Sequence, residues 1–109
     1  MQIAFETEEL RDLCLKADVA EARVGAAHTA SLFAALADIR AAATAIELFM
    51  GEFIEASENV PPMIRIAIGS YGKLLLVSNQ VRHNGPNAEG VDWSQVKRVR
   101  IMEVVPHGA

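Results

Sequence analysis

Cationic side chains and one histidine in the second half of the chain are the residues best suited to act on a phosphate. Arg98 and Arg100 alternate with Val99 and Ile101 along the predicted last strand, and His107 follows it. This alternation sends the two arginines to the face opposite the two apolar side chains. One surface of the strand can therefore build a core while the other carries positive charge.

Metal-free cleavage of RNA needs a base for the ribose 2′-OH, cations for the phosphorane charge, and an acid for the leaving oxygen. His107 could serve as base or acid, because an imidazole changes charge near neutral pH. The simpler interpretation of a histidine at this position is a solvated residue of a frayed tail. The pattern alone leaves both interpretations open.

Two further cations are candidates for phosphate contact. Arg65 points away from the apolar side of its predicted strand, so it would converge with Arg98 and Arg100 on one sheet face if the strands are neighbours. The simpler interpretation is a solvated face with ion-pair partners such as Glu103. Lys73, which starts the next strand, is equally suited to protecting a sheet edge from aggregation.

Aromatic residues could stack on RNA bases. Tyr71 lies in the turn 69–72, where it would be a turn aromatic with base stacking open to it. Trp93 precedes an alternating strand, and this position favours an anchor in the core.

The pattern predicts neither a metal nor a cofactor. His28 at the start of the second helix and His83 in a loop share no spacing with other ligand types. Cys14 lies on the apolar side of the first helix with no histidine patterned beside it, so we expect an inert core thiol and no nucleophile.

Composition indicates one domain over residues 1–109. The chain has 51% hydrophobic residues and a net charge of −4. Residues 1–58 hold four basic and eleven acidic residues, whereas residues 59–109 hold six basic and three acidic residues. The second half can therefore bind an anion despite the negative net charge of the chain.

No stretch supplies the ~20 apolar residues of a membrane span. No export signal or disulfide pattern is evident, and a cytoplasmic protein is expected.

Alternating and helical apolar spacings divide the chain into elements. They predict a strand over 1–6, helices over 7–25 and 27–43, a hairpin of strands over 63–68 and 73–78, a loop over 79–92, and a last strand containing 98–101. The order β-α-α-β-β-β indicates an α+β domain with two N-terminal helices on one face of a mainly antiparallel sheet. The opposite face would carry the arginines.

Four phrases occur in order along nearly the whole chain: Met1-Gln-Ile-Ala-Phe-Glu-Thr-Glu-Glu-Leu10, Leu36-Ala-Asp-Ile-Arg-Ala41, Arg65-Ile-Ala-Ile-Gly69 with Lys73-Leu74, and Gly90-Val-Asp-Trp-Ser-Gln-Val96 leading into Arg98-Val-Arg-Ile-Met-Glu-Val104. In these phrases the chain resembles the HigB/RelE-type toxins of bacterial type II toxin–antitoxin modules, especially the plasmid-maintenance killer subgroup.

The resemblance implies a RelE-like fold and a toxin that cleaves mRNA on the ribosome and is neutralised by a helix-turn-helix antitoxin. It implies catalytic roles for His107, Arg65 and Lys73, and the exposed face adds Arg98, Arg100 and Tyr71 as RNA-binding candidates.

One departure from the family pattern motivates an alternative hypothesis. The family usually closes with Asp-Tyr-His-Gly, whereas this chain has Val105 and Pro106 before His107. The alternative is a catalytically degenerate RelE-like module that binds an antitoxin without cleaving RNA.

Overall fold

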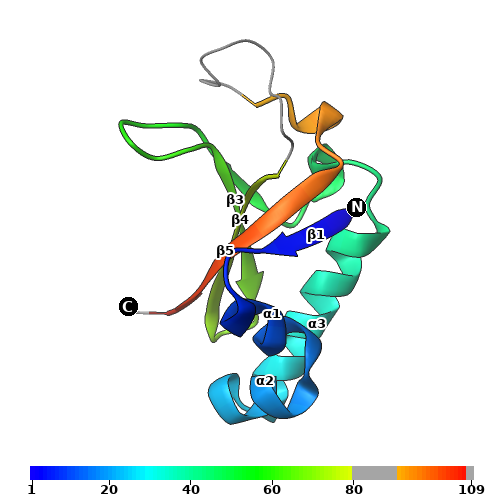
Figure 1. Ribbon diagram of the computed structural model, residues 1–109, viewed down its shortest axis with the longest axis vertical. Helices are drawn as coiled ribbons and strands as arrows, with labels where there is room; N and C mark the ends of the chain where they lie inside the picture. The colour runs from blue at the N-terminus through cyan, green and yellow to red at the C-terminus, as the bar shows by residue number, and fades with distance from the viewer. Residues whose placement is uncertain (80–90, 108–109) are drawn as a thin grey trace.

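A computed structural model describes residues 1–79 and 91–107 and shows an α+β fold (Figure 1). A five-stranded, mostly antiparallel sheet carries three helices. The predicted fold class is confirmed at this level. Most of the loop predicted over 79–92 lies outside the described residues, as does His83.

The helices and strands vary in length from three to 16 residues. In chain order they are β1 (Gln2–Phe5), α1 (Glu8–Leu15), α2 (Ala17–Val24), α3 (Ala26–Ala41), the 3₁₀ turn η1 (Ala45–Glu47), β2 (Glu52–Ile54), β3 (Met63–Ile68), β4 (Gly72–Ser78), the 3₁₀ turn η2 (Trp93–Gln95) and β5 (Arg98–Pro106).

The sheet order is β1-β5-β4-β3-β2, so the first and last strands of the chain are neighbours. β1 runs parallel to β5, and the other three pairings are antiparallel. The parallel pair requires a crossover, which the helices provide on one side of the sheet (Figure 1).

The prediction of two N-terminal helices is wrong, because the first predicted helix is two helices. Thr7 caps α1, its side chain accepting a hydrogen bond from the Leu10 N–H. Lys16 then takes extended backbone angles, φ −115° and ψ 115°, and interrupts the helix. The interruption lets α2 pack on both α1 and α3. Tertiary packing therefore overrides a helical spacing that continues unbroken in the sequence.

The predicted order β-α-α-β-β-β is also one strand short. β2 pairs antiparallel with β3, with Phe53 opposite Ile64. A strand of three residues is too short to show an alternating pattern of its own. The observed order is β-α-α-α-β-β-β-β.

The core lies between the helices and one face of the sheet. Its largest side chains are fully buried, among them Leu13, Leu36, Ile66, Leu74 and Ile101. Burying such a side chain stabilises the fold by roughly 1.5–3 kcal/mol relative to leaving it in water. A register that turned these side chains outward would therefore be strongly disfavoured. Side chains of the alternate positions are then obliged to lie on the opposite, uncovered face.

A register shift in the pairing of β4 with β5 changes which side chains of β5 reach that uncovered face. Leu76 lies opposite Ile101 and Leu75 opposite Glu103, so Met102 is the extra residue of a β-bulge. The bulge keeps Val104 in the core and turns Glu103 outward.

Among the described residues, the length and hydropathy that a membrane crossing requires are met by no helix.

Candidate functional site

A shallow pocket of about 280 Å³ lies on the uncovered face, where β3, β4 and the end of β5 meet. Arg65, Lys73 and His107 all line it. The remaining lining residues are Met63, Gly72, Leu75, Val105 and Pro106. The structure thus brings together the three residues that the resemblance assigned to catalysis.

Strand register places the two cations of this pocket. Arg65 lies opposite Leu75, and Lys73 lies opposite Ala67 on one side and Val105 on the other. Because alternate side chains of β3 and β4 fill the core, Arg65 and Lys73 must both project from the uncovered face.

The tail histidine is fixed through its backbone. The His107 N–H donates a hydrogen bond to the Tyr71 carbonyl oxygen at 2.6 Å. Gly72 lies opposite Pro106, and a Cβ at Gly72 would collide with the Val105 carbonyl oxygen. A glycine is therefore needed for β5 to approach the turn closely. The His107 side chain is exposed at the pocket rim.

The Glu52 carboxylate of β2 interacts with both Arg65 and Lys73. Arg65 donates hydrogen bonds from Nε and Nη2 to Glu52 Oε1 at 3.1 and 2.7 Å. The Lys73 Nζ lies 3.7 Å from the same oxygen. Two cations and one carboxylate leave the cluster with one net positive charge when His107 is neutral. The sequence interpretation missed Glu52 because β2 was not predicted.

Arg98 and Arg100 share the face but not the pocket. Arg100 donates from Nε to Asn79 Oδ1 at 2.9 Å, and its Nη1 lies 3.6 Å from Glu6 Oε2. At about 3.3 Å per residue, the five residues from Arg100 to Val105 place Arg100 roughly 15 Å along β5 from the pocket. Arg65, Arg98 and Arg100 therefore share one face of the sheet, as expected. They do not converge, because only Arg65 lines the pocket.

Tyr71 is half-buried and packs away from the pocket. Its ring centroid lies 5.4 Å from that of His28. The His28 Nδ1 lies 2.9 Å from the Val24 carbonyl oxygen, and Nε2 lies 3.3 Å from Ser70 Oγ. Since a carbonyl only accepts, Nδ1 carries the proton. His28 of α3 thus contacts Ser70 and Tyr71 of the turn between β3 and β4, and the Tyr71 ring packs at this contact between the helix and the turn.

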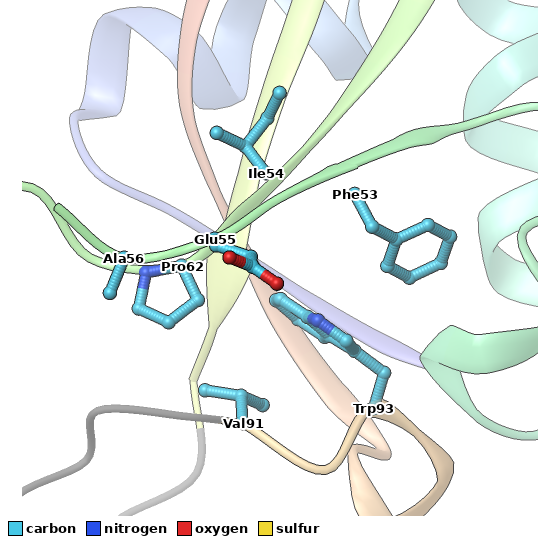
Figure 2. A pocket seen from close by; sticks show the side chains of 7 residues that line it. All are labelled: Phe53, Ile54, Glu55, Ala56, Pro62, Val91 and Trp93. Atoms are coloured by element: carbon cyan, nitrogen blue, oxygen red, sulfur yellow. The ribbon is translucent and has the colours of Figure 1, made fainter.

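A second, larger pocket of about 590 Å³ lies beyond β2 (Figure 2). Its residues are Phe53, Ile54, Glu55, Ala56, Pro62, Val91 and Trp93. The Phe53 and Trp93 rings make an edge contact with centroids 5.8 Å apart. Trp93 packs against the core but is only half-buried. The expected core anchor is therefore also a pocket wall.

No group of side chains suited to holding a metal ion occurs in the described ranges 1–79 and 91–107. Cys14 is buried, and desolvation raises the pKa of its thiol to about 11, an effect opposed by the Arg40 charge. A thiol that resists ionisation is a poor nucleophile.

Comparison of the chain with protein-family models, curated proteins and solved structures finds no match.

Proposed function

We propose that this chain is the toxin component of a type II toxin–antitoxin module, with a RelE-like fold, and that it cleaves mRNA without a metal. The observation that carries the proposal is the pocket at which Arg65 of β3, Lys73 of β4 and His107, the residue after β5, come together. Two cations and an imidazole supply the phosphorane-stabilising charges and the general acid that metal-free phosphodiester cleavage requires.

The pocket and the adjacent Glu52, which contacts Arg65 and Lys73, supply a complete proton balance if Glu52 acts as the base. The Glu52 carboxylate takes the proton of the ribose 2′-OH as the 2′-oxygen forms a bond to phosphorus. The phosphorus–5′-oxygen bond then breaks, and protonated His107 gives its proton to the leaving oxygen. The products are a 2′,3′-cyclic phosphate and a 5′-OH. Arg65 and Lys73 stabilise the charge that develops on the phosphorane oxygens.

The same charges indicate why the ribosome would be needed. RNA affinity grows with the number of phosphates that cations neutralise. Arg65 already donates to Glu52, and the whole chain has a net charge of −4. Weak intrinsic affinity for free RNA follows, so the ribosome would have to hold the mRNA in place. A cytoplasmic location belongs to this proposal.

The direct test is cleavage of a reporter mRNA in a translating extract, mapped by primer extension. The soluble protein, free of any partner, should cut the mRNA, and His107→Ala should reduce cutting by about 10²–10⁴-fold, the range of general acid–base catalysis. Arg11→Ala, which removes an exposed cation from α1, is the matched control and should cut normally. Intact mRNA with the wild-type protein contradicts the proposal.

A second candidate is a module that binds an antitoxin but has lost cleavage. The observation that favours it is the pair of hydrogen bonds that the Arg65 guanidinium donates to Glu52. These bonds engage donors that Arg65 would need to hold a phosphate. A co-purifying helix-turn-helix protein encoded by the adjacent gene, together with no cleavage on programmed ribosomes, would support this candidate. Cleavage that is lost in His107→Ala would exclude it.

A further inference from the structure

Large apolar side chains are concentrated on the surface between α3 and β3. Four of them lie within eight consecutive residues: Ile46 is 46% exposed, Phe49 87%, Met50 48% and Phe53 37%. Such a concentration of exposed apolar surface is characteristic of binding sites, whereas single exposed residues are ordinary. Phe53 also lines the 590 Å³ pocket, so the exposed segment leads into a concave site.

The pocket combines aromatic walls with a carboxylate. Figure 2 shows the Glu55 side chain extending toward the Trp93 ring in this view, with Phe53 beside the same space. Pro62 and Val91 complete the apolar wall. An aromatic face and a carboxylate both attract a cation, and the surrounding apolar side chains favour an aliphatic stem.

The segment that supplies Phe53, Ile54, Glu55 and Ala56 to this pocket carries charge of one sign. Residues 46–60 contain four acidic residues, Glu47, Glu52, Glu55 and Glu58, and no lysine or arginine. Glu47 closes the capping box of η1, and Glu52 binds Arg65. Glu55 and Glu58 form no ion pair with any residue in the described ranges. The carboxylate of Glu55 at the aromatic pocket is thus available to a ligand.

We propose that the Phe53–Trp93 pocket and the exposed apolar side chains of residues 46–53 bind a segment of a partner protein that carries lysine or arginine beside large apolar residues. The cation enters between the aromatic rings and Glu55, and the apolar residues cover Phe49 and Met50. RNA is disfavoured at this surface, because every charged residue of 46–60 is a glutamate and would repel its phosphates. A second copy docking through the same surface is disfavoured for the same reason, since symmetric pairing would place like charges together.

This docking surface shares no lining residue with the Arg65–Lys73–His107 pocket. None of the residues assigned to peptide binding, Phe49, Met50, Phe53, Glu55 and Trp93, has a role in the proposed RNA cleavage, so the two proposals can fail separately.

Trp93 is the only tryptophan of the chain, so its fluorescence reports directly on the pocket. The probes are short synthetic peptides of alternating leucine and arginine, with leucine–glutamine and leucine–glutamate peptides of the same length for comparison. The leucine–arginine peptide should produce a saturable change in Trp93 emission, the glutamine peptide should bind at least about fivefold more weakly, and the glutamate peptide should not bind.

Two variants test the assignment, and each has a matched control. Glu55→Gln and Phe53→Ala should each weaken binding of the leucine–arginine peptide by about fivefold or more. Glu21→Gln on α2 and Leu15→Ala on α1 remove an exposed carboxylate and an exposed apolar side chain elsewhere and should leave binding unchanged. Glu55→Gln removes only charge, so it remains informative if Phe53→Ala fails to fold.

Several results would overturn the inference. These are the absence of a saturable change with the leucine–arginine peptide, equal binding of the glutamate peptide, and equal binding by Glu55→Gln. Saturable quenching of Trp93 by an oligouridylate would assign the surface to RNA instead. Self-association that Phe49→Ser abolishes, measured by analytical ultracentrifugation, would assign it to a second copy.

Discussion

Glu52 and Arg65 lie directly opposite each other on β2 and β3, and the guanidinium donates two hydrogen bonds to one carboxylate oxygen. Both side chains are substantially exposed, Arg65 at 39% and Glu52 at 54%, so this pair contributes at most about 1 kcal/mol to stability. Its larger effect is local: it sets the charge of the pocket and presents a carboxylate to any RNA bound there.

Replacing Glu52 should separate RNA binding from RNA cleavage. Glu52→Gln raises the net charge of the pocket by one, so a non-cleavable 2′-O-methyl RNA should bind more tightly. The slope of log affinity against log salt should steepen by about 0.7. Cleavage should fall by about 10²-fold or more because the proposed base is lost. Fluorescence anisotropy and primer extension measure the two effects.

Glu21→Gln is the control for this experiment, because it removes one exposed carboxylate from α2. It should change neither quantity. Faster cleavage by Glu52→Gln would show that Glu52 restrains the pocket and is not its base.

A methyl group at Gly72 should disturb the end of β5. In Gly72→Ala the new Cβ collides with the Val105 carbonyl oxygen and Pro106 Cα, so the strand must move. Such overpacking costs about 1–3 kcal/mol, measured by urea unfolding. Cleavage should fall as well, because His107 is held by the neighbouring Tyr71 carbonyl.

Ser70→Ala in the same turn is the comparison. It removes only the 3.3 Å contact with His28 Nε2, which is worth about 1 kcal/mol or less. Equal stability of the Gly72→Ala and wild-type proteins would show that β5 can retreat without cost.

The helix-covered face of the sheet should dominate stability. Leu36→Ala removes a side chain with 0% exposure and should lower the free energy of unfolding by about 2–5 kcal/mol. Leu15→Ala makes the same change at a side chain 52% exposed and should cost well under half as much. Urea denaturation of both variants gives the comparison, and similar losses would contradict the observed core.

Alkaline pH should destabilise the protein through Cys14. Burial raises the pKa of this thiol from 9.0 to about 11, with Arg40 opposing. Between these values the unfolded chain releases the proton that the folded protein keeps, so stability is full below pH 9 and falls as pH rises toward 11. The loss should approach about 2–3 kcal/mol.

Other groups titrate in the same range, so the measurement is the difference in unfolding free energy between the wild-type protein and Cys14→Ala at each pH. This difference should shrink as pH rises. A difference that stays constant between pH 9 and 11 would mean that Cys14 titrates alike in both states.

Sequence alone predicted the elements whose pattern is local. Ile64, Ile66 and Ile68 alternate along β3, the pattern that predicts a strand over 63–68, and each is buried. Likewise, Thr7 is a helix cap because its side chain bonds a backbone N–H three residues away. The break at Lys16 was not predictable, since it depends on where α3 lies rather than on neighbouring residues.

The residue types and strand faces of the candidate site were also determined by sequence, because alternation along a strand is a property of the backbone. That is why Arg65, Arg98 and Arg100 could be placed on the face opposite the core. Tertiary structure alone decided which of these side chains meet. Antiparallel register brings Arg65, Lys73 and His107 to one pocket and sets Glu52 against Arg65, whereas Arg100 lies farther along β5 and binds Asn79. Strand order and register arise from contacts between residues distant in the chain, and no local pattern encodes them.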